Sequence, residues 1–176
     1  MTDRIDDGIG TYDVVLLVEH AVSEQDAAQA VALHNEIADQ VVYHVLVPVE
    51  DAAARIESAM GALATGEVMT SPALAMSEED LAEVRRECLE QSQADLDLTL
   101  ERYRAAGVQA EGQVVHGPPI DALAEVVKAV DAREAIIVTR PHVVAEFFHV
   151  DWTSQARRKL GVPVLHLLEH EESDTP

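Results

Sequence analysis

Short apolar runs alternate with amphipathic segments along this chain. Residues 14–18 are a continuous run of valine and leucine, and similar runs lie at 41–49, 108–116, 135–138 and 162–168. Such runs are typical of strands that are covered on both faces in a parallel sheet. Between the runs, apolar residues recur at helical spacing. The pattern therefore predicts five strands separated by helices.

Serine and glycine mark where the helices should begin and end. Ser23 precedes Asp26, and Ser77 precedes Asp80, by the three residues that separate an N-cap from its acidic partner. Gly107 and Gly161 are expected to end helices in the left-handed conformation. The apolar positions assigned to the first helix are Ala27, Val31, Leu33 and Ile37, and those of the long helix are Leu81, Val84, Cys88, Leu89, Leu96, Leu100 and Tyr103.

Two further helices complete the pattern, and one stretch is irregular. The turn at 117–119 leads into a helix with apolar residues at 120, 123, 127 and 130, and a short helix carries Trp152, Ala156 and Leu160. Residues 50–76 are rich in alanine and methionine and are interrupted by Gly61, Gly66 and Pro72. We expect a short helix and then a mobile loop there.

Strict alternation of strand and helix predicts an α/β fold. Right-handed crossovers leave few solutions other than an open, parallel, five-stranded sheet with helices on both faces, in three layers of Rossmann-like type. We expect a flexible arm at 1–11, a single domain at 12–168 and a disordered acidic tail at 169–176. Ligands in such sheets lie beyond the carboxyl ends of the strands. The positions that follow the strands are Glu19, His20, Val49, His116, Gly117 and 139–142.

The net charge of the chain limits the kinds of molecule that it can bind. The 176 residues hold 33 Asp and Glu against 12 Lys and Arg, a formal charge of −21, and only Lys128 and Lys159 are lysines. Broad binding to nucleic acid or to anionic lipid is excluded, because it needs clustered cations. A halophilic source and an arginine-rich codon bias both explain this composition.

Cysteine content and the lack of targeting segments indicate a compartment. Cys88, the single cysteine, cannot form an internal disulfide, and its place in a helical apolar stripe favours a buried, inert thiol. The sequence shows neither a signal peptide nor an apolar run of about 20 residues. We expect a cytoplasmic protein with no membrane partner.

Common catalytic and nucleotide motifs are absent. Gly61 and Gly66 have the glycine spacing of a phosphate-binding loop, but Glu67 and Val68 stand where Lys and Ser or Thr are needed. No dinucleotide fingerprint follows the first strand, and no nucleophile elbow occurs. No catalytic set is visible.

The layout resembles the universal stress protein family over roughly residues 11–168. The resemblance is carried by Glu19 after the first strand, the turn Gly117-Pro118-Pro119, the run 136–138 and the segment 161–165, Gly-Val-Pro-Val-Leu. It implies the adenine nucleotide alpha hydrolase-like form of the fold and a homodimer joined through the last strand, residues 162–168. In one branch of the family it also implies ATP binding.

The glycines of that ATP-binding branch are missing here. Its spacing places them at Thr139, His142 and Trp152, with Thr153 at the hydroxyl position. Glycines let backbone amides approach phosphate oxygens, and side chains obstruct that approach. Glu19 also replaces the branch's usual Asp. The resemblance therefore implies a degenerate ATP site and no bound cofactor, with ATP or another nucleotide disfavoured.

One segment keeps an anion-binding alternative open. Residues 133–159 hold five cations (Arg133, Arg140, Arg157, Arg158, Lys159) and three acids (Glu134, Glu146, Asp151). Arg140, with Thr153 near a helix start, could hold a nucleotide or a small anion. Equally, the last three cations could simply complement a helix C-terminus.

Histidines raise a third alternative. His20, His116 and His142 each follow a strand and could converge on a metal with Glu19, although ordinary hydrogen-bonded histidines are the better default. A metal-dependent enzyme would follow from such a cluster.

The resemblance thus implies a stress-response or regulatory homodimer that acts by binding, and it favours a role other than catalysis. The residues expected to line its cleft are Glu19, His20, Val49, His116, Gly117, Thr139, Arg140, His142 and Thr153.

Overall fold

The structure is a computed structural model that describes residues 10–50, 76–140 and 149–170, with backbone only for 149–152. Residues 1–9 of the expected arm, the tail beyond residue 170, the stretch 51–75 and His142 lie outside these residues. Thr11, expected in the arm, is instead the first residue of a strand. The helices and strands, in chain order, are β1 (Thr11–Val18), α1 (Glu24–Ala32), β2 (Gln40–Pro48), α3 (Glu78–Ala105), β3 (Gln109–Val115), α4 (Pro119–Ala129), β4 (Glu134–Thr139), α5 (His149–Lys159) and β5 (Val164–Leu168).

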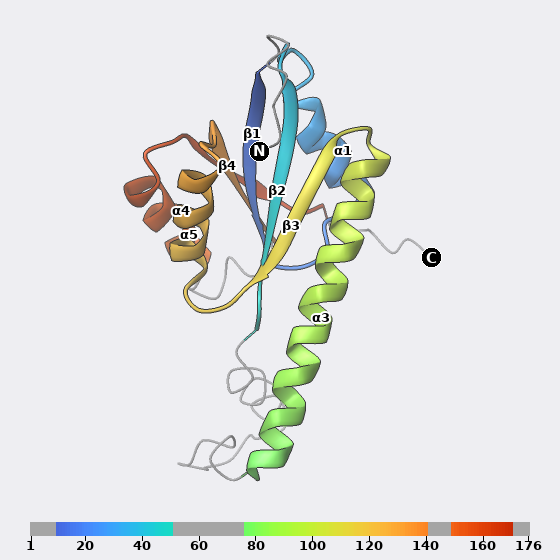
Figure 1. Ribbon diagram of the computed structural model, residues 1–176, viewed down its shortest axis with the longest axis vertical. Helices are drawn as coiled ribbons and strands as arrows, with labels where there is room; N and C mark the ends of the chain where they lie inside the picture. Colours follow the sequence, from blue (N-terminus) through green and yellow to red (C-terminus); the bar gives the residue numbers. More distant parts are fainter. Residues whose placement is uncertain (1–9, 51–75, 141–148, 171–176) are drawn as a thin grey trace, which may run out of the picture.

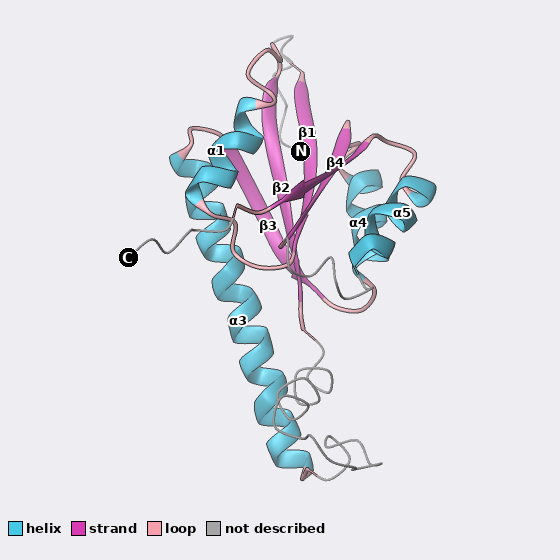
Figure 2. Cartoon of the chain, turned by 180° about the vertical axis from the view of Figure 1, so that it is seen from behind, coloured by secondary structure: helices cyan, strands magenta, loops and turns pink. Residues whose placement is uncertain are grey.

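The five strands form one parallel sheet in the order β3-β2-β1-β4-β5. Figure 1 shows α4 and α5 together on one side of the strands, and Figure 2, from behind, shows α1 and α3 on the other. The predicted α/β class with three layers is confirmed. No described helix is long and apolar enough to cross a bilayer.

The core lies on both faces of β1. Residues 14–18 are all fully buried. Val14, Leu16 and Val18 pack in one apolar cluster with residues of α1 and α3, while Val15 and Leu17 pack in a second cluster with residues of α4 and α5. Because strand side chains alternate between faces, this continuous apolar run can contribute to both clusters.

The predicted helix caps are confirmed. The Ser23 side chain accepts the Asp26 backbone N–H, and the Ser77 side chain accepts that of Asp80, both at 3.1 Å. Gly107 and Gly161 have φ of 90° and 65°, which glycine adopts without a steric penalty.

Three apolar assignments are wrong. The first helix ends at Ala32, Leu33 is 53% exposed, and Ile37 lies beyond the helix. His34 is buried instead, 2.6 Å from the Tyr43 hydroxyl, with Glu134 on its other ring nitrogen. Turning the chain here brings this imidazole to two polar partners. Leu89, expected in the α3 stripe, is 42% exposed, because Cys88 and Ser92 mark the buried side of α3 in this turn and Leu89 lies outside it.

Candidate functional site

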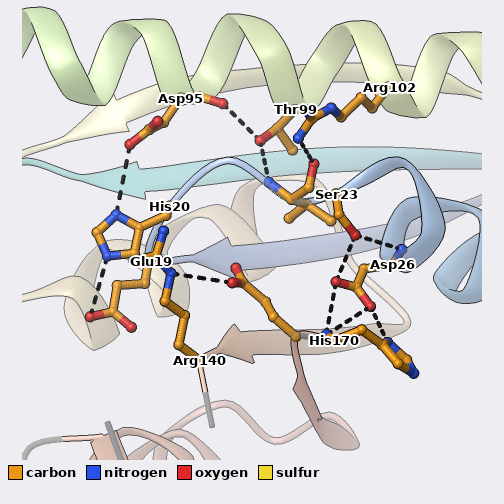
Figure 3. Close-up of polar contacts among 11 residues, drawn as sticks. Glu19, His20, Ser23, Asp26, Asp95, Thr99, Arg102, Arg140 and His170 are labelled. Atoms are coloured by element: carbon orange, nitrogen blue, oxygen red, sulfur yellow. Dashed lines mark hydrogen bonds and ion pairs between the residues drawn. The ribbon is translucent and has the colours of Figure 1, made fainter. Parts of the chain in front are cut away.

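The strand order reverses between β1 and β4. The chain passes from β1 to β2 on one side of β1, whereas β4 pairs with its other side. In parallel sheets, ligands bind at the carboxyl ends of the strands that flank such a switch point. Glu19 and His20 follow β1, and Arg140 follows β4, so the structure brings these three predicted residues to one place (Figure 3).

His20 lies between two carboxylates. Its Nε2 is 3.8 Å from Glu19 Oε1, and its Nδ1 is 3.9 Å from Asp95 Oδ2 on α3. The Asp95 side chain is 13% exposed, and that of His20 is 37% exposed. Both separations are longer than a hydrogen bond, so the imidazole lies near these two carboxylates without being hydrogen-bonded to them.

Arg140 is paired with the residue that follows β5. Its Nε is 3.5 Å from Glu169 Oε2, and the guanidinium is half exposed whereas the Glu169 side chain is only 12% exposed. Burial raises the pKa of Glu169, Arg140 opposes this, and the charges of Asp26 and Glu19 raise it further. The Glu169 backbone N–H donates to the Thr139 carbonyl at 2.9 Å, which holds the pair at the end of β4.

Asp26 adds a further carboxylate beside Glu169. Its oxygens accept hydrogen bonds from the Ser23 hydroxyl and from the backbone N–H of His170, whose ring Nδ1 is 2.5 Å from Oδ1 (Figure 3). The first turn of α1 is thereby linked to the chain after β5. We call Glu19, Asp26, Asp95, Arg140 and Glu169 the switch-point cluster; it holds four carboxylates and one guanidinium.

The two threonines of the expected ATP pattern have different surroundings. Thr139 is buried as the last residue of β4, and its Oγ1 is 2.8 Å from Nε2 of His166 on β5. It is thus held in regular strand structure. Thr153 is buried in α5, and its hydroxyl has no hydrogen-bond partner within the described ranges.

The remaining predicted positions lie farther along the same sheet edge. The Val49 N–H donates to the Val115 carbonyl at 3.0 Å, so the ends of β2 and β3 stay together. His116 is exposed, and Gly117 has φ of 78° at the turn into α4. These three residues follow β2 and β3, on the far side of β1 from Arg140.

Metal ligation finds no support in the described residues. In residues 10–50, 76–140 and 149–170, no three His, Cys, Asp or Glu side chains are grouped so as to hold an ion. β1 and β3, which precede His20 and His116, are separated by β2.

Sequence reasoning missed several residues of this site. Asp95, Thr99 and Arg102 form a polar line at i, i+4, i+7 along α3: the Thr99 hydroxyl accepts the Val22 N–H at 3.1 Å, and Arg102 donates to the Val22 carbonyl at 2.6 Å. Polar residues at helical spacing next to the apolar stripe were the available signal. Glu169 and His170 were assigned to the tail. Their partners Arg140 and Asp26 are far away in the sequence, so no local pattern indicates these contacts.

Comparison with known proteins rests on structure alone, because no family model and no curated protein matches this sequence. The hypothetical protein MJ0577 superposes with a TM-score of 0.55 at 13% identity, over 92% of this chain and 98% of its own. A universal stress protein from Archaeoglobus fulgidus gives 0.50 at 16% identity, over 89% and 93%. A universal stress protein in complex with cAMP gives 0.50 at 14% identity, over 92% and 100%.

These superpositions establish the fold, and at 13–16% sequence identity they establish nothing about function. The parallel order, the switch point between β1 and β4, and nearly full coverage of both chains agree with the sequence resemblance. The chain has the fold of the universal stress proteins.

Proposed function

We propose that this chain is a regulatory protein of the universal stress type that acts by binding, and that its switch-point cluster does not hold ATP. The observation that carries the second part is the pairing of Arg140 with Glu169 among further carboxylates. A polyphosphate needs converging cations or free backbone amides. Here it would meet Glu19, Asp26 and Glu169 around one guanidinium.

The charges at the cluster support this part of the proposal. Two like charges about 4 Å apart repel by roughly 1 kcal/mol in water and about 4 kcal/mol at the effective dielectric near a protein surface. Arg140 is half exposed and already paired, so its attraction is screened and shared. The carboxylates therefore outweigh the single cation for any ligand with several phosphates.

Backbone conformation supports the same conclusion. Thr139 stands where the ATP-binding branch of the universal stress proteins has its first glycine. Its side chain is buried in β4 and hydrogen-bonded to the His166 ring. A phosphate-binding turn at this position would break that contact and the hydrogen bond from Glu169 to the Thr139 carbonyl. Both contacts hold the ends of β4 and β5 together.

Calorimetric titration of the full chain with magnesium ATP, and separately with cAMP, tests this proposal. No saturable heat is expected from either ligand up to millimolar concentration. Micromolar ATP binding would overturn the proposal. A titration with Arg140→Ala shows whether any heat that does occur comes from the cluster.

A second candidate, a small-anion or nucleotide binder, is favoured by two observations. The Arg140 guanidinium is half exposed, and the buried Thr153 hydroxyl has no partner among the residues that the structure describes. In this candidate Glu169 competes with the ligand for Arg140. Glu169→Gln would then bind inorganic phosphate more tightly than the wild type, and adding Arg140→Ala would abolish the gain; equal, negligible binding by all three proteins would exclude this candidate.

We also propose that the chain forms a homodimer through β5. This strand lies at one edge of the sheet, and Leu165 and Leu168 on it are 41% and 49% exposed. An unpaired strand edge with exposed leucines favours association with a second chain.

Light scattering in size-exclusion chromatography tests the dimer with matched variants. Leu165→Glu should give a monomer, because it places a charge where the two strands would meet. Leu33→Glu, at the comparably exposed end of α1, should leave the dimer intact. A monomeric wild type, or a dimer that survives Leu165→Glu, would contradict this interface.

A further inference from the structure

A concave site lies away from the switch-point cluster, on the face of the sheet that α4 and α5 cover. It is a groove of about 320 Å³ between α4 and strands β2 and β3. α4 packs on β1 and α5 on β5, which leaves part of β2 and β3 uncovered by these helices. Figure 1 views the sheet from this side, with α4 beside the strands. The lining residues are His44, Leu46, Glu111, Gly112, Gln113, Val126, Ala129 and Val130.

One wall of the groove carries an ionic ladder across three strands. His44 Nε2 is 2.7 Å from Asp13 Oδ1 on β1, and His44 Nδ1 is 2.9 Å from Glu111 Oε1 on β3. Asp13 also accepts a hydrogen bond from the Thr11 hydroxyl at 2.8 Å. Both ring nitrogens are thus engaged, and the imidazole is fixed in place with only 10% of its side chain exposed.

The charge of this ladder does not balance. Two carboxylates share one imidazole, so even a protonated His44 leaves the three groups at −1. The excess is accessible at Glu111, whose side chain is 71% exposed, whereas that of Asp13 is 15% exposed. None of the groove-lining residues, all of them described, is Lys or Arg.

The opposite wall is apolar. Val126 on α4 and Val130, the residue that follows α4, are half-buried; Ala129 is the last residue of α4, and Leu46 is buried on β2. The groove therefore combines an exposed carboxylate and the Gln113 amide with hydrocarbon surface. This combination favours a ligand with a cationic head and a short aliphatic chain, which pairs with Glu111 and covers the α4 valines.

We propose that this groove binds a small aliphatic ammonium ion, with Glu111 as the charge partner and Val126 and Val130 as the apolar wall. The site is distinct from the switch-point cluster, because the two share no residue. Its ligand is of opposite charge to the nucleotides considered above.

The test is an NMR amide titration of the full chain with n-butylammonium chloride at fixed ionic strength. Saturable shifts are expected at Gly112, Gln113, Val126 and Val130, and n-butanol, which lacks the charge, should give none. The probe carries a single charge, so its non-specific electrostatic attraction to a protein of net charge −21 stays small. Absence of saturation up to about 50 mM, which corresponds to a very weak complex, would overturn the proposal.

Matched variants separate the site from overall charge. Glu111→Gln should weaken butylammonium binding about fivefold, the order expected for one exposed charge contact. Glu101→Gln removes the same charge from the exposed face of α3 and should leave the affinity unchanged. Ala129→Lys, which puts an ammonium group on the groove wall, should abolish binding. Equal affinity in Glu111→Gln and Glu101→Gln, or unchanged binding in Ala129→Lys, would refute the site.

Discussion

Gly112 is fixed by the space around it. A Cβ at this position on β3 would lie 2.4 Å from the Val45 carbonyl oxygen and 2.7 Å from Leu96 Cδ1. Gly10 differs, because the atoms nearest to its Cβ position would be 3.8 Å away. Both residues are glycine, but only one has a steric reason to be.

Gly112→Ala is therefore expected to destabilise the fold by about 1–3 kcal/mol, since β3 must move away from β2 or α3. Gly10→Ala should change the free energy of unfolding by less than about 0.5 kcal/mol. Urea denaturation of both variants measures these values. Equal stability of the two variants would refute the steric account.

Ionisation of the Glu169 carboxyl opposes folding. Its pKa is raised, chiefly by burial, so the folded state holds this proton to a higher pH than the unfolded chain does. As pH rises through the window between the ordinary glutamate value of about 4.3 and the raised folded value, stability from this group is lost.

Glu169→Gln removes this titration. The free energy of unfolding of the variant, relative to the wild type, should increase as pH rises from below that window to neutrality. Urea denaturation of both proteins at several pH values measures the difference, in which other titrating groups largely cancel. A difference that decreases with pH would show that the Arg140 pair outweighs burial.

At the scale of elements, α3 holds the chain that follows β1. The Thr99 hydroxyl accepts the buried Val22 N–H and itself donates to the Asp95 carbonyl at 2.7 Å. Arg102 donates to the Val22 carbonyl. These bonds fix the segment that carries Glu19 and His20.

Thr99→Val should cost about 1–3 kcal/mol, because it keeps the volume and leaves a buried N–H without an acceptor. Thr99→Ser keeps the hydroxyl and should lose less. Thermal unfolding compares the two, and hydrogen exchange at the Val22 amide should speed up in the valine variant alone. Slow exchange in Thr99→Val would contradict this role.

The elements themselves follow from local patterns that the sequence shows directly. The run at 14–18 is buried, and Ser23, Ser77, Gly107 and Gly161 mark helix ends as predicted. His34 could not be predicted, because its partners Tyr43 and Glu134 come from two other elements. The common location of Glu19, His20 and Arg140 could be predicted, because strand ends converge at a switch point. The roles of Asp95, Glu169 and His170 depend on tertiary contacts and could not be predicted from the sequence.

At the scale of the whole molecule, the charge of −21 works against compactness. The Debye length falls from about 30 Å at 0.01 M salt to about 3 Å at 1 M, which removes most repulsion between exposed carboxylates. The described ion pairs are few beside the excess of acids.

The unfolding temperature should therefore rise between 0.01 M and 1 M KCl. Differential scanning calorimetry measures it, and an equal osmolality of an uncharged solute should produce a smaller rise. A fall in the unfolding temperature with KCl would mean that ion pairs such as Arg140–Glu169 outweigh the net repulsion.

The chain has the universal stress protein fold, and we propose that its switch-point cluster is too acidic for ATP. An amide NMR titration with magnesium ATP tests it most directly, because it reports on individual residues. No saturable shifts are expected at Glu19, His20, Arg140 and Glu169. Saturable shifts at these amides with a micromolar midpoint would contradict it.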